Sequence, residues 1–149
     1  MQVYYPIYSV VLAEVPGEIS IGFQVRGCGL KCPGCSYRSL ERFGYHDLSL
    51  SEFETILEAN SGLATAVVFM GGDWCQDFVP MLQRARIRGF KTCLYSGLTD
   101  LDMIDQRLLE RLDFVKTGRW LGIPISDPNS NQRFYSLPDR QDLSVAFRR

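Results

Sequence analysis

Three of the five cysteines of this chain lie close together in the stretch RGCGLKCPGCSYR, residues 26–38. Three residues separate Cys28 from Cys32, and two separate Cys32 from Cys35. Thiolates are good ligands for soft metal centres, and three of them on one short loop can converge on a single centre. The neighbouring glycines let the backbone turn tightly around it. The stretch therefore predicts a metal site with Cys28, Cys32 and Cys35 as ligands.

Two kinds of metal centre compete for this loop. A structural zinc site needs four protein ligands, usually in two close pairs. The other candidate ligands are His46, Cys75 and Cys93, and none of them forms a second pair. A cubane iron–sulfur cluster ordinarily takes four thiolates, so that three would leave one iron open to another ligand. The ligand count favours the iron–sulfur cluster, with zinc as the alternative.

A second candidate stretch is MGGD, residues 70–73, which ends the apolar run TAVVFM at 65–70. Such a run is typical of a buried strand. Taken alone, Gly71, Gly72 and Asp73 indicate an ordinary turn. Beside the cysteine loop, however, the two glycines would let a ligand approach the backbone closely, and Asp73 could face a cationic group.

The elements that must position these residues follow from the apolar periodicity. Strands are predicted over 19–25, 65–70, 91–96 and 113–118, and helices over 49–60, 76–88 and 101–112. Ser49 or Ser51 is the expected N-cap of the first helix. Strands that alternate with helices of ten or more residues predict βαβ units and a parallel sheet.

This order places special residues after each of the four strands: the cysteine loop, Gly71-Gly72-Asp73, Ser96-Gly97 and Thr117-Gly118. Functional sites in parallel α/β folds lie at the carboxyl ends of the strands. A closed (β/α) barrel takes roughly 250 residues, whereas this chain has 149. We therefore expect one α/β domain over residues 1–149, a partial, open TIM-like barrel with a curled parallel sheet and all four stretches on one rim.

Composition and charge narrow the class of protein. The chain is 46% hydrophobic and 22% charged, with sixteen basic and seventeen acidic residues. This balance gives no basic field for nucleic acid or an anionic membrane. No apolar run approaches the roughly 20 residues of a spanning helix, and the first residues lack the features of a signal peptide. We expect a cytoplasmic protein without disulfides, since its cysteine count is odd.

With these elements placed, the motif Cys28-x3-Cys32-x2-Cys35 resembles the signature of radical S-adenosylmethionine (AdoMet) enzymes, and MGGD at 70–73 resembles their glycine-rich motif. Within that superfamily, the short chain, the CPGC and GGD stretches and SNQRFY at 130–135 are similar to activating proteins of anaerobic ribonucleoside-triphosphate reductases. The resemblance covers about residues 19–135 and leaves 136–149 as an accessory tail. It departs at Ser36-Tyr37, Trp74 and Lys116-Thr117-Gly118, where the family often has Tyr-Asn, proline and Val-Asp-Gly.

The resemblance implies a [4Fe-4S] cluster bound by Cys28, Cys32 and Cys35, with AdoMet on the open iron. Reduction would then cleave AdoMet to methionine and a 5′-deoxyadenosyl radical. The implied AdoMet contacts are Gly34, Cys35, Ser36, Gly71, Gly72 and Asp73. Many members carry an aromatic residue just before the third cysteine to pack near adenine, where this chain has Gly34, and Tyr37 is a candidate for the missing ring. Ser96 and Lys116 are candidates for contacts to ribose or carboxylate.

The implied partner is the glycyl-radical subunit of anaerobic ribonucleoside-triphosphate reductase, with a reductant such as flavodoxin. An open partial barrel suits a macromolecular substrate whose loop enters its mouth. Two other functions stay open. One is an activase for another glycyl-radical enzyme, or a small radical AdoMet enzyme that acts on a metabolite. The other is a non-enzymatic iron–sulfur or zinc module that binds a partner or carries electrons.

The remaining cysteines, the single histidine and the C-terminal segment are expected to have structural roles or to contact the partner. We expect His46 in a solvated loop, Cys93 in the core, and Cys75 near the cluster but not bound to it. After residue 118 the chain shows no sustained helical or strand period. It is expected to pack as a loop over the sheet edge, with Asn131, Gln132 and Arg133 available to bind the backbone of an inserted loop.

Overall fold

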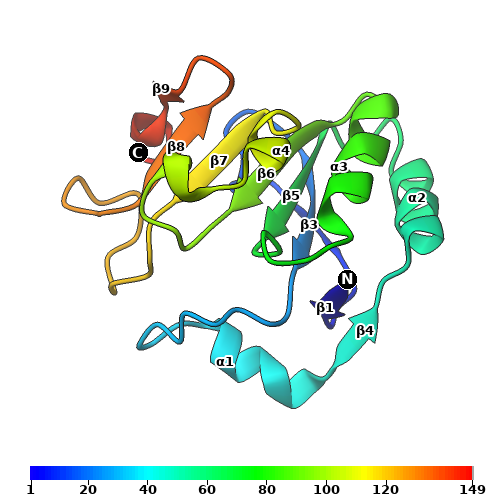
Figure 1. Cartoon of the computed structure of the whole chain (residues 1–149), viewed down its shortest axis with the longest axis horizontal. Helices are drawn as coiled ribbons and strands as arrows, with labels where there is room; N and C mark the ends of the chain where they lie inside the picture. Colours follow the sequence, from blue (N-terminus) through cyan, green and yellow to red (C-terminus); the bar gives the residue numbers. More distant parts are fainter. Residues whose placement is uncertain (149) are drawn as a thin grey trace.

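A seven-stranded sheet forms the centre of the computed structural model, which describes residues 1–148 (Figure 1). Its strands lie in the order β2 (Ser9–Val11), β3 (Ser20–Gln24), β5 (Ala66–Met70), β6 (Lys91–Tyr95), β7 (Phe114–Thr117), β8 (Arg133–Ser136) and β9 (Gln141–Asp142). The central strands β3, β5, β6 and β7 are parallel, and the edge strands β2, β8 and β9 pair antiparallel. The chain is therefore mixed α/β with a parallel centre.

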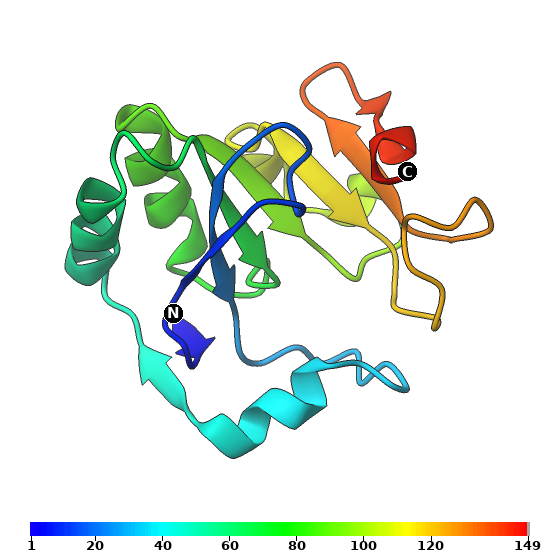
Figure 2. The ribbon, with the colours of Figure 1, turned by 180° about the vertical axis from the view of Figure 1, so that it is seen from behind.

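Short helices connect the strands. They are α1 (Tyr37–Leu40), α2 (Leu50–Ala59), α3 (Phe78–Ile87) and α4 (Gln106–Leu109), with 3₁₀ helices η1 (Glu41–Phe43), η2 (Leu101–Met103) and η3 (Ser144–Phe147). A small second sheet pairs β1 (Gln2–Tyr4) with β4 (Tyr45–Asp47). In Figures 1 and 2 the segment from β3 to α2 runs as a wide arc beyond the arrowheads of β3 and β5.

The core between the sheet and helices α2 and α3 is built largely from phenylalanines. Phe23 on β3 and Phe69 on β5 stack with their centroids 5.5 Å apart, and Phe78 of α3 meets Phe69 edge-on at 4.8 Å. Phe53 of α2 packs against both strands. All four rings are fully buried. Because large aromatic side chains dominate the energetics of a core, this cluster fixes the helices on the sheet.

The predicted central elements are confirmed with one exception. The four parallel strands and helices α2 and α3 lie where the periodicity placed them, and the Ser49 hydroxyl caps α2 by accepting from the Glu52 backbone N–H. The single helix predicted over 101–112 was wrong. It is divided into η2 and α4, because the carboxylates of Asp100 and Asp105 accept from the backbone N–H groups of Asp102 and Arg107. Such local bonds offer the backbone an alternative to a continuous helix.

The two edges of the sheet were not predicted. Strand β2 comes from the N-terminal segment, and β8 and β9 come from the tail that was expected to be a loop. No strand pairing joins β2 to β9 in residues 1–148, so the sheet is open and no closed barrel forms. A TIM-like curl of this sheet stays a prediction. None of the helices in the described part of the chain is long and apolar enough to span a membrane.

Candidate functional site

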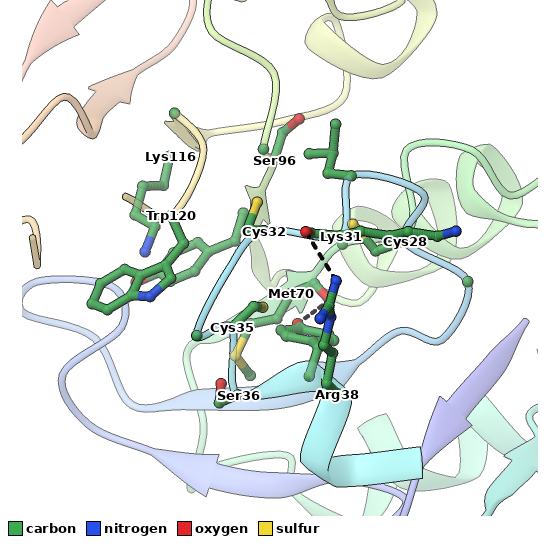
Figure 3. Close-up of a pocket in the computed structure, with 18 of the residues that line it drawn as sticks. Cys28, Lys31, Cys32, Cys35, Ser36, Arg38, Met70, Ser96, Lys116 and Trp120 are labelled. Atoms are coloured by element: carbon green, nitrogen blue, oxygen red, sulfur yellow. Dashed lines mark hydrogen bonds between the residues drawn. The ribbon is translucent and has the colours of Figure 1, made fainter. Parts of the chain in front are cut away.

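A cavity of about 640 Å³ lies at the carboxyl ends of β3, β5, β6 and β7 (Figure 3). Its volume is within the roughly 300–1,000 Å³ typical of small-molecule sites. One side, here called the cysteine-loop wall, consists of the lining residues from Gly27 to Arg38. The other, here called the strand-end wall, consists of Met70, Gly71, Tyr95, Ser96, Gly97, Lys116 and Gly118. The expected meeting of four strand ends at one rim is confirmed.

All three cysteines of the loop line this cavity as free thiols. Cys28 is exposed, Cys35 is half-buried and Cys32 is buried. A turn closed by the Cys35 N–H and the Cys32 carbonyl, 3.2 Å apart, joins the last two. Within residues 1–148, however, no three His, Cys, Asp or Glu side chains come together as a metal-binding group. The three thiols thus line one cavity but do not point to a common centre. Their side chains or the loop must rearrange before all three can bind one metal centre.

The donor chemistry in the cavity fits a [4Fe-4S] cluster with three protein ligands. The lining contains three thiols and no histidine, and neither of the other two cysteines belongs to it. Cys93 is fully buried in β6, where burial raises the pKa of its thiol well above the usual value. Cys75 lines a different cavity of about 390 Å³, beside Asp73. A cluster held by the loop would therefore keep one iron without a protein thiolate.

The glycine-rich stretch is divided between two environments. Gly71 lines the cavity with its φ at +87°, and an added Cβ would lie 2.7 Å from Cη2 of Trp74. Gly72 does not line the cavity, and it faces Val25 and Met1 instead. Glycine at 71 is thus required both by its backbone conformation and by the indole that covers it.

Asp73 lies behind the strand-end wall and does not line the main cavity. Its Oδ2 accepts a 3.1 Å hydrogen bond from the Ser96 hydroxyl, which does line the cavity. Its Oδ1 is buried without a partner among the described residues, and burial raises the pKa of this carboxyl. Asp73 therefore positions Ser96, and the direct contact of Asp73 with a ligand stays a prediction.

Lys116 places a cation on the strand-end wall. Its Nζ lies 4.0 Å from the ring centroid of Tyr95, whose hydroxyl donates to the Glu14 carbonyl. Lys116 forms no ion pair within residues 1–148. Burial lowers the pKa of its ammonium to about 8. A half-buried ammonium beside a cavity is available to an anionic ligand group, and such pairing would stabilise its charge.

Tyr37, the candidate for the missing ring, lines the cavity and also links two parts of the fold, while its contact with adenine stays a prediction. Its hydroxyl donates to the Met70 carbonyl at 2.5 Å, and burial raises its pKa. The ring also meets Tyr4 edge-on, with centroids 6.1 Å apart. Tyr37 therefore ties α1 to the end of β5 and joins the two walls. Its neighbours Gly34, Cys35 and Ser36 line the cavity as expected.

Six lining residues outside the predicted site stretches were missed by the sequence analysis: Tyr4, Glu14, Glu41, Trp74, Tyr95 and Trp120. Tyr95 ends β6 and Trp120 follows β7 by three residues, so the rule that sites lie at strand ends could have found both. Trp74 was noted only as a departure from the family pattern. Glu14 comes from the N-terminal segment, which carries no periodic pattern that would place it here.

Other expectations need correction. His46 is not in a solvated loop: it lies on β4, half-buried, with Nε2 2.7 Å from the Glu52 carboxylate, because β1 pairs with this segment. Cys75 is not at the main cavity. Arg133 points into its own segment, since its Nη1 donates to the Ser130 and Gln132 carbonyls. Gln132 lines the cavity, but its amide donates to the Gly118 carbonyl.

The comparisons with known proteins gave one match. A family model described as a 4Fe-4S single cluster domain matches residues 16–135, which include the cysteine loop, all four parallel strands and most of β8. No curated protein matches the chain, and no solved structure matches it.

Proposed function

The chain belongs to the family of 4Fe-4S single cluster domains, and on this premise we propose that it is a radical AdoMet enzyme. In this proposal it cleaves AdoMet reductively and generates a glycyl radical on an anaerobic ribonucleoside-triphosphate reductase. The cysteine spacing and the glycine-rich strand end support the first step. The short chain and the NQRFY stretch support the choice of partner.

One observation favours an enzyme over a module that only carries electrons. The cavity of about 640 Å³ is lined by all three cysteines and by the ends of the parallel strands. A small molecule therefore has room directly beside the thiols. An electron carrier needs no such space next to its cluster, whereas a concave site with a few polar groups is typical of substrate binding.

The residues of the two walls have separate tasks in this proposal. Cys28, Cys32 and Cys35 would hold the cluster. When bound and reduced, it supplies one electron that splits AdoMet into methionine and a 5′-deoxyadenosyl radical. On the strand-end wall, the Lys116 ammonium can pair with a carboxylate. The Ser96 hydroxyl donates to Asp73 and accepts from the Leu98 backbone N–H, so it can accept one further hydrogen bond from a ligand. Gly71 leaves the end of β5 without a side chain.

An exposed apolar side chain at the cavity supports a macromolecular substrate. Trp74 lines the cavity and is 43% exposed. Its free surface is available for contact with another protein. A loop that carries the reactive glycine would enter here, and a reductant such as flavodoxin would deliver the electron.

The first experiment tests the chemistry. Protein reconstituted with iron and sulfide under anaerobic conditions is reduced with dithionite in the presence of AdoMet, and the products are separated by chromatography. Methionine and 5′-deoxyadenosine in equal amounts are expected. Protein that holds about four irons but releases neither product would overturn the enzymatic proposal and leave an iron–sulfur module. Protein that retains zinc and no iron would contradict the cluster itself.

The second experiment tests the partner. The chain is expressed anaerobically with an anaerobic ribonucleoside-triphosphate reductase, and electron paramagnetic resonance is used to detect a glycyl radical. A doublet signal that requires Cys32 in this chain is expected. Product formation without any glycyl signal, in that reductase or in other glycyl-radical enzymes, would indicate a metabolite as the substrate.

A further inference from the structure

The indole nitrogen of Trp120 lies near Gly34, the residue directly before the third cysteine. Gly34 has no side chain, and a Cβ built there would be 3.8 Å from Nε1 of Trp120, an ordinary van der Waals contact. Both residues line the main cavity. Figure 3 shows Trp120 on the same cavity as Cys35 and Lys116. The space above position 34 is thus bordered by a ring from a distant part of the chain.

Trp120 is held in this place from two sides. The guanidinium of its neighbour Arg119 donates from Nη2 to the Leu30 carbonyl at 2.6 Å, which ties the segment to the cysteine-loop wall. The Asn131 amide donates to the Arg119 carbonyl at 3.0 Å, which ties it to the start of β8. The backbone beside Trp120 is therefore held at the cavity by contacts that do not involve the ring itself.

The other aromatic residues of the cavity are engaged within the fold. Tyr37 and Tyr4 donate their hydroxyls to Met70 and Glu41. One face of Tyr95 is covered by the Lys116 ammonium. The Trp74 indole donates to the Arg26 carbonyl and covers Gly71. Within residues 1–148, Trp120 has neither a hydrogen bond nor an aromatic partner, and its side chain is only partly buried.

An indole that lines a cavity and has no aromatic partner can stack with a flat aromatic ring of a ligand. Stacking of a nucleobase on an aromatic side chain contributes roughly 1–3 kcal/mol. Indole offers the largest ring face of any side chain, and the neighbouring hydrogen bonds hold the backbone that carries it, so little backbone entropy is lost on binding. We propose that Trp120 is the stacking surface for the purine base of the bound nucleoside, and thus positions the ligand beside the cysteine loop. This inference rests on the proposed function, in which that nucleoside is AdoMet.

Binding of AdoMet provides the test, with protein that holds its oxidised cluster. Affinity is measured by anaerobic equilibrium dialysis with labelled AdoMet for wild type, Trp120→Ala, Trp120→Phe and Leu121→Ala. Trp120→Ala is expected to weaken binding about 5- to 150-fold, the equivalent of one base stack, whereas Trp120→Phe keeps most of the affinity. Leu121→Ala is the matched control, because Leu121 is on the same segment but 61% exposed and outside the lining. It is expected to bind like wild type.

A second readout does not depend on a folded Ala variant. The chain has two tryptophans, so protein labelled with 5-fluorotryptophan gives two fluorine resonances. The one absent in Trp120→Phe belongs to Trp120, and it is expected to shift on addition of AdoMet through the ring current of adenine. Suppose that wild-type protein binds AdoMet, that Trp120→Ala binds it with the same affinity, and that the Trp120 resonance does not shift. This result would overturn the inference about Trp120 and leave the proposed function intact. Wild-type protein that holds its cluster but does not bind AdoMet would overturn the proposed function, and this inference with it.

Discussion

The two walls of the cavity are built on different principles. The strand-end wall consists of residues at the ends of β5, β6 and β7, which are held by ladder hydrogen bonds and by a fully buried phenylalanine core. The cysteine-loop wall has no regular secondary structure between β3 and α1. It is held by single contacts, among them Arg119 to Leu30, Arg38 to Lys31 and Tyr37 to Met70.

The interactions that stabilise the fold therefore differ from those that would form the metal site. The core and the strand ends use apolar burial and backbone pairing, which need no metal. The cysteine-loop wall presents three thiols that do not converge within the described residues. A cluster that bound all three would add constraints to the less constrained wall. We therefore expect the fold to tolerate loss of the cluster, and each of the following changes examines that separation.

Replacing any one of Cys28, Cys32 or Cys35 with alanine is expected to have the largest effect. Each variant should lose the [4Fe-4S] cluster, because three thiolates are already fewer than the usual four. Iron analysis and the absorbance near 400 nm measure this loss, and far-ultraviolet circular dichroism of the apo protein is expected to stay unchanged. Cys75→Ala is the control, since Cys75 lines another cavity. Retention of the cluster after loss of any of the three would disprove the ligand assignment.

Phe69→Ala acts on the other wall through the core beneath it. Phe69 is fully buried and contacts the rings of Phe23, Phe53 and Phe78. The void left when the Phe69 ring is removed is expected to lower the free energy of unfolding by about 3–5 kcal/mol. Urea denaturation of apo protein measures it, with Phe69→Leu as a milder comparison. A loss below about 1 kcal/mol would mean that this cluster is not the core of the fold.

Lys116→Met tests the charge held on the strand-end wall. The unfolded lysine keeps its proton up to about pH 10.4, whereas in the folded protein burial lowers the pKa to about 8. Between these values the unfolded state binds more protons, so the stability of the wild type rises with pH. The variant lacks this charge and is expected to be more stable than wild type below pH 8.

This advantage of Lys116→Met should shrink as the pH approaches 10. Urea denaturation of both apo proteins at pH 7 and pH 10 gives the comparison. A difference in stability that is the same at both pH values would show that burial does not perturb Lys116. In the AdoMet-binding assay, the same substitution is expected to weaken binding most below pH 8, where the wild-type ammonium is charged.

Tyr37→Phe removes one link between the walls and is expected to have the smallest effect. The variant loses the hydrogen bond to the Met70 carbonyl, which contributes on the order of 1 kcal/mol. Urea denaturation measures the fold, and the rate of iron loss to a chelator measures the site. We expect a clear increase in that rate with little change in stability. A loss of stability above about 3 kcal/mol would instead mean that the two walls unfold as one unit.

The centre of the fold follows from the sequence because its signals are local. Apolar runs such as residues 65–70 and the cap at Ser49 specify β5 and α2 without reference to the rest of the chain. Strands β2 and β8 were missed because they are short and gain their strand form by pairing with β3 and β7. The break at Ile104 was missed because carboxylate hydrogen bonds override an amphipathic period.

The site follows a similar division. The cysteine motif, Gly71, Ser96 and Lys116 could be placed from spacing and from their positions at strand ends. The orientation of Asp73 could not, because it depends on the hydroxyl of Ser96 that binds it. Nor could the approach of Trp120 to Gly34, which results from contacts of Arg119 and Asn131 across the chain.

The edges of the sheet have a consequence for the behaviour of concentrated samples. The two outer strands are short, with three residues in β2 and two in β9. An outer strand can recruit a neighbouring molecule through its free backbone groups, and short, polar outer strands prevent this. Gln141 and Asp142 of β9 are both exposed and polar, so a second molecule would find few groups to pair with. Intermolecular sheet growth from β9 is therefore disfavoured at the high concentrations that spectroscopy of iron centres requires.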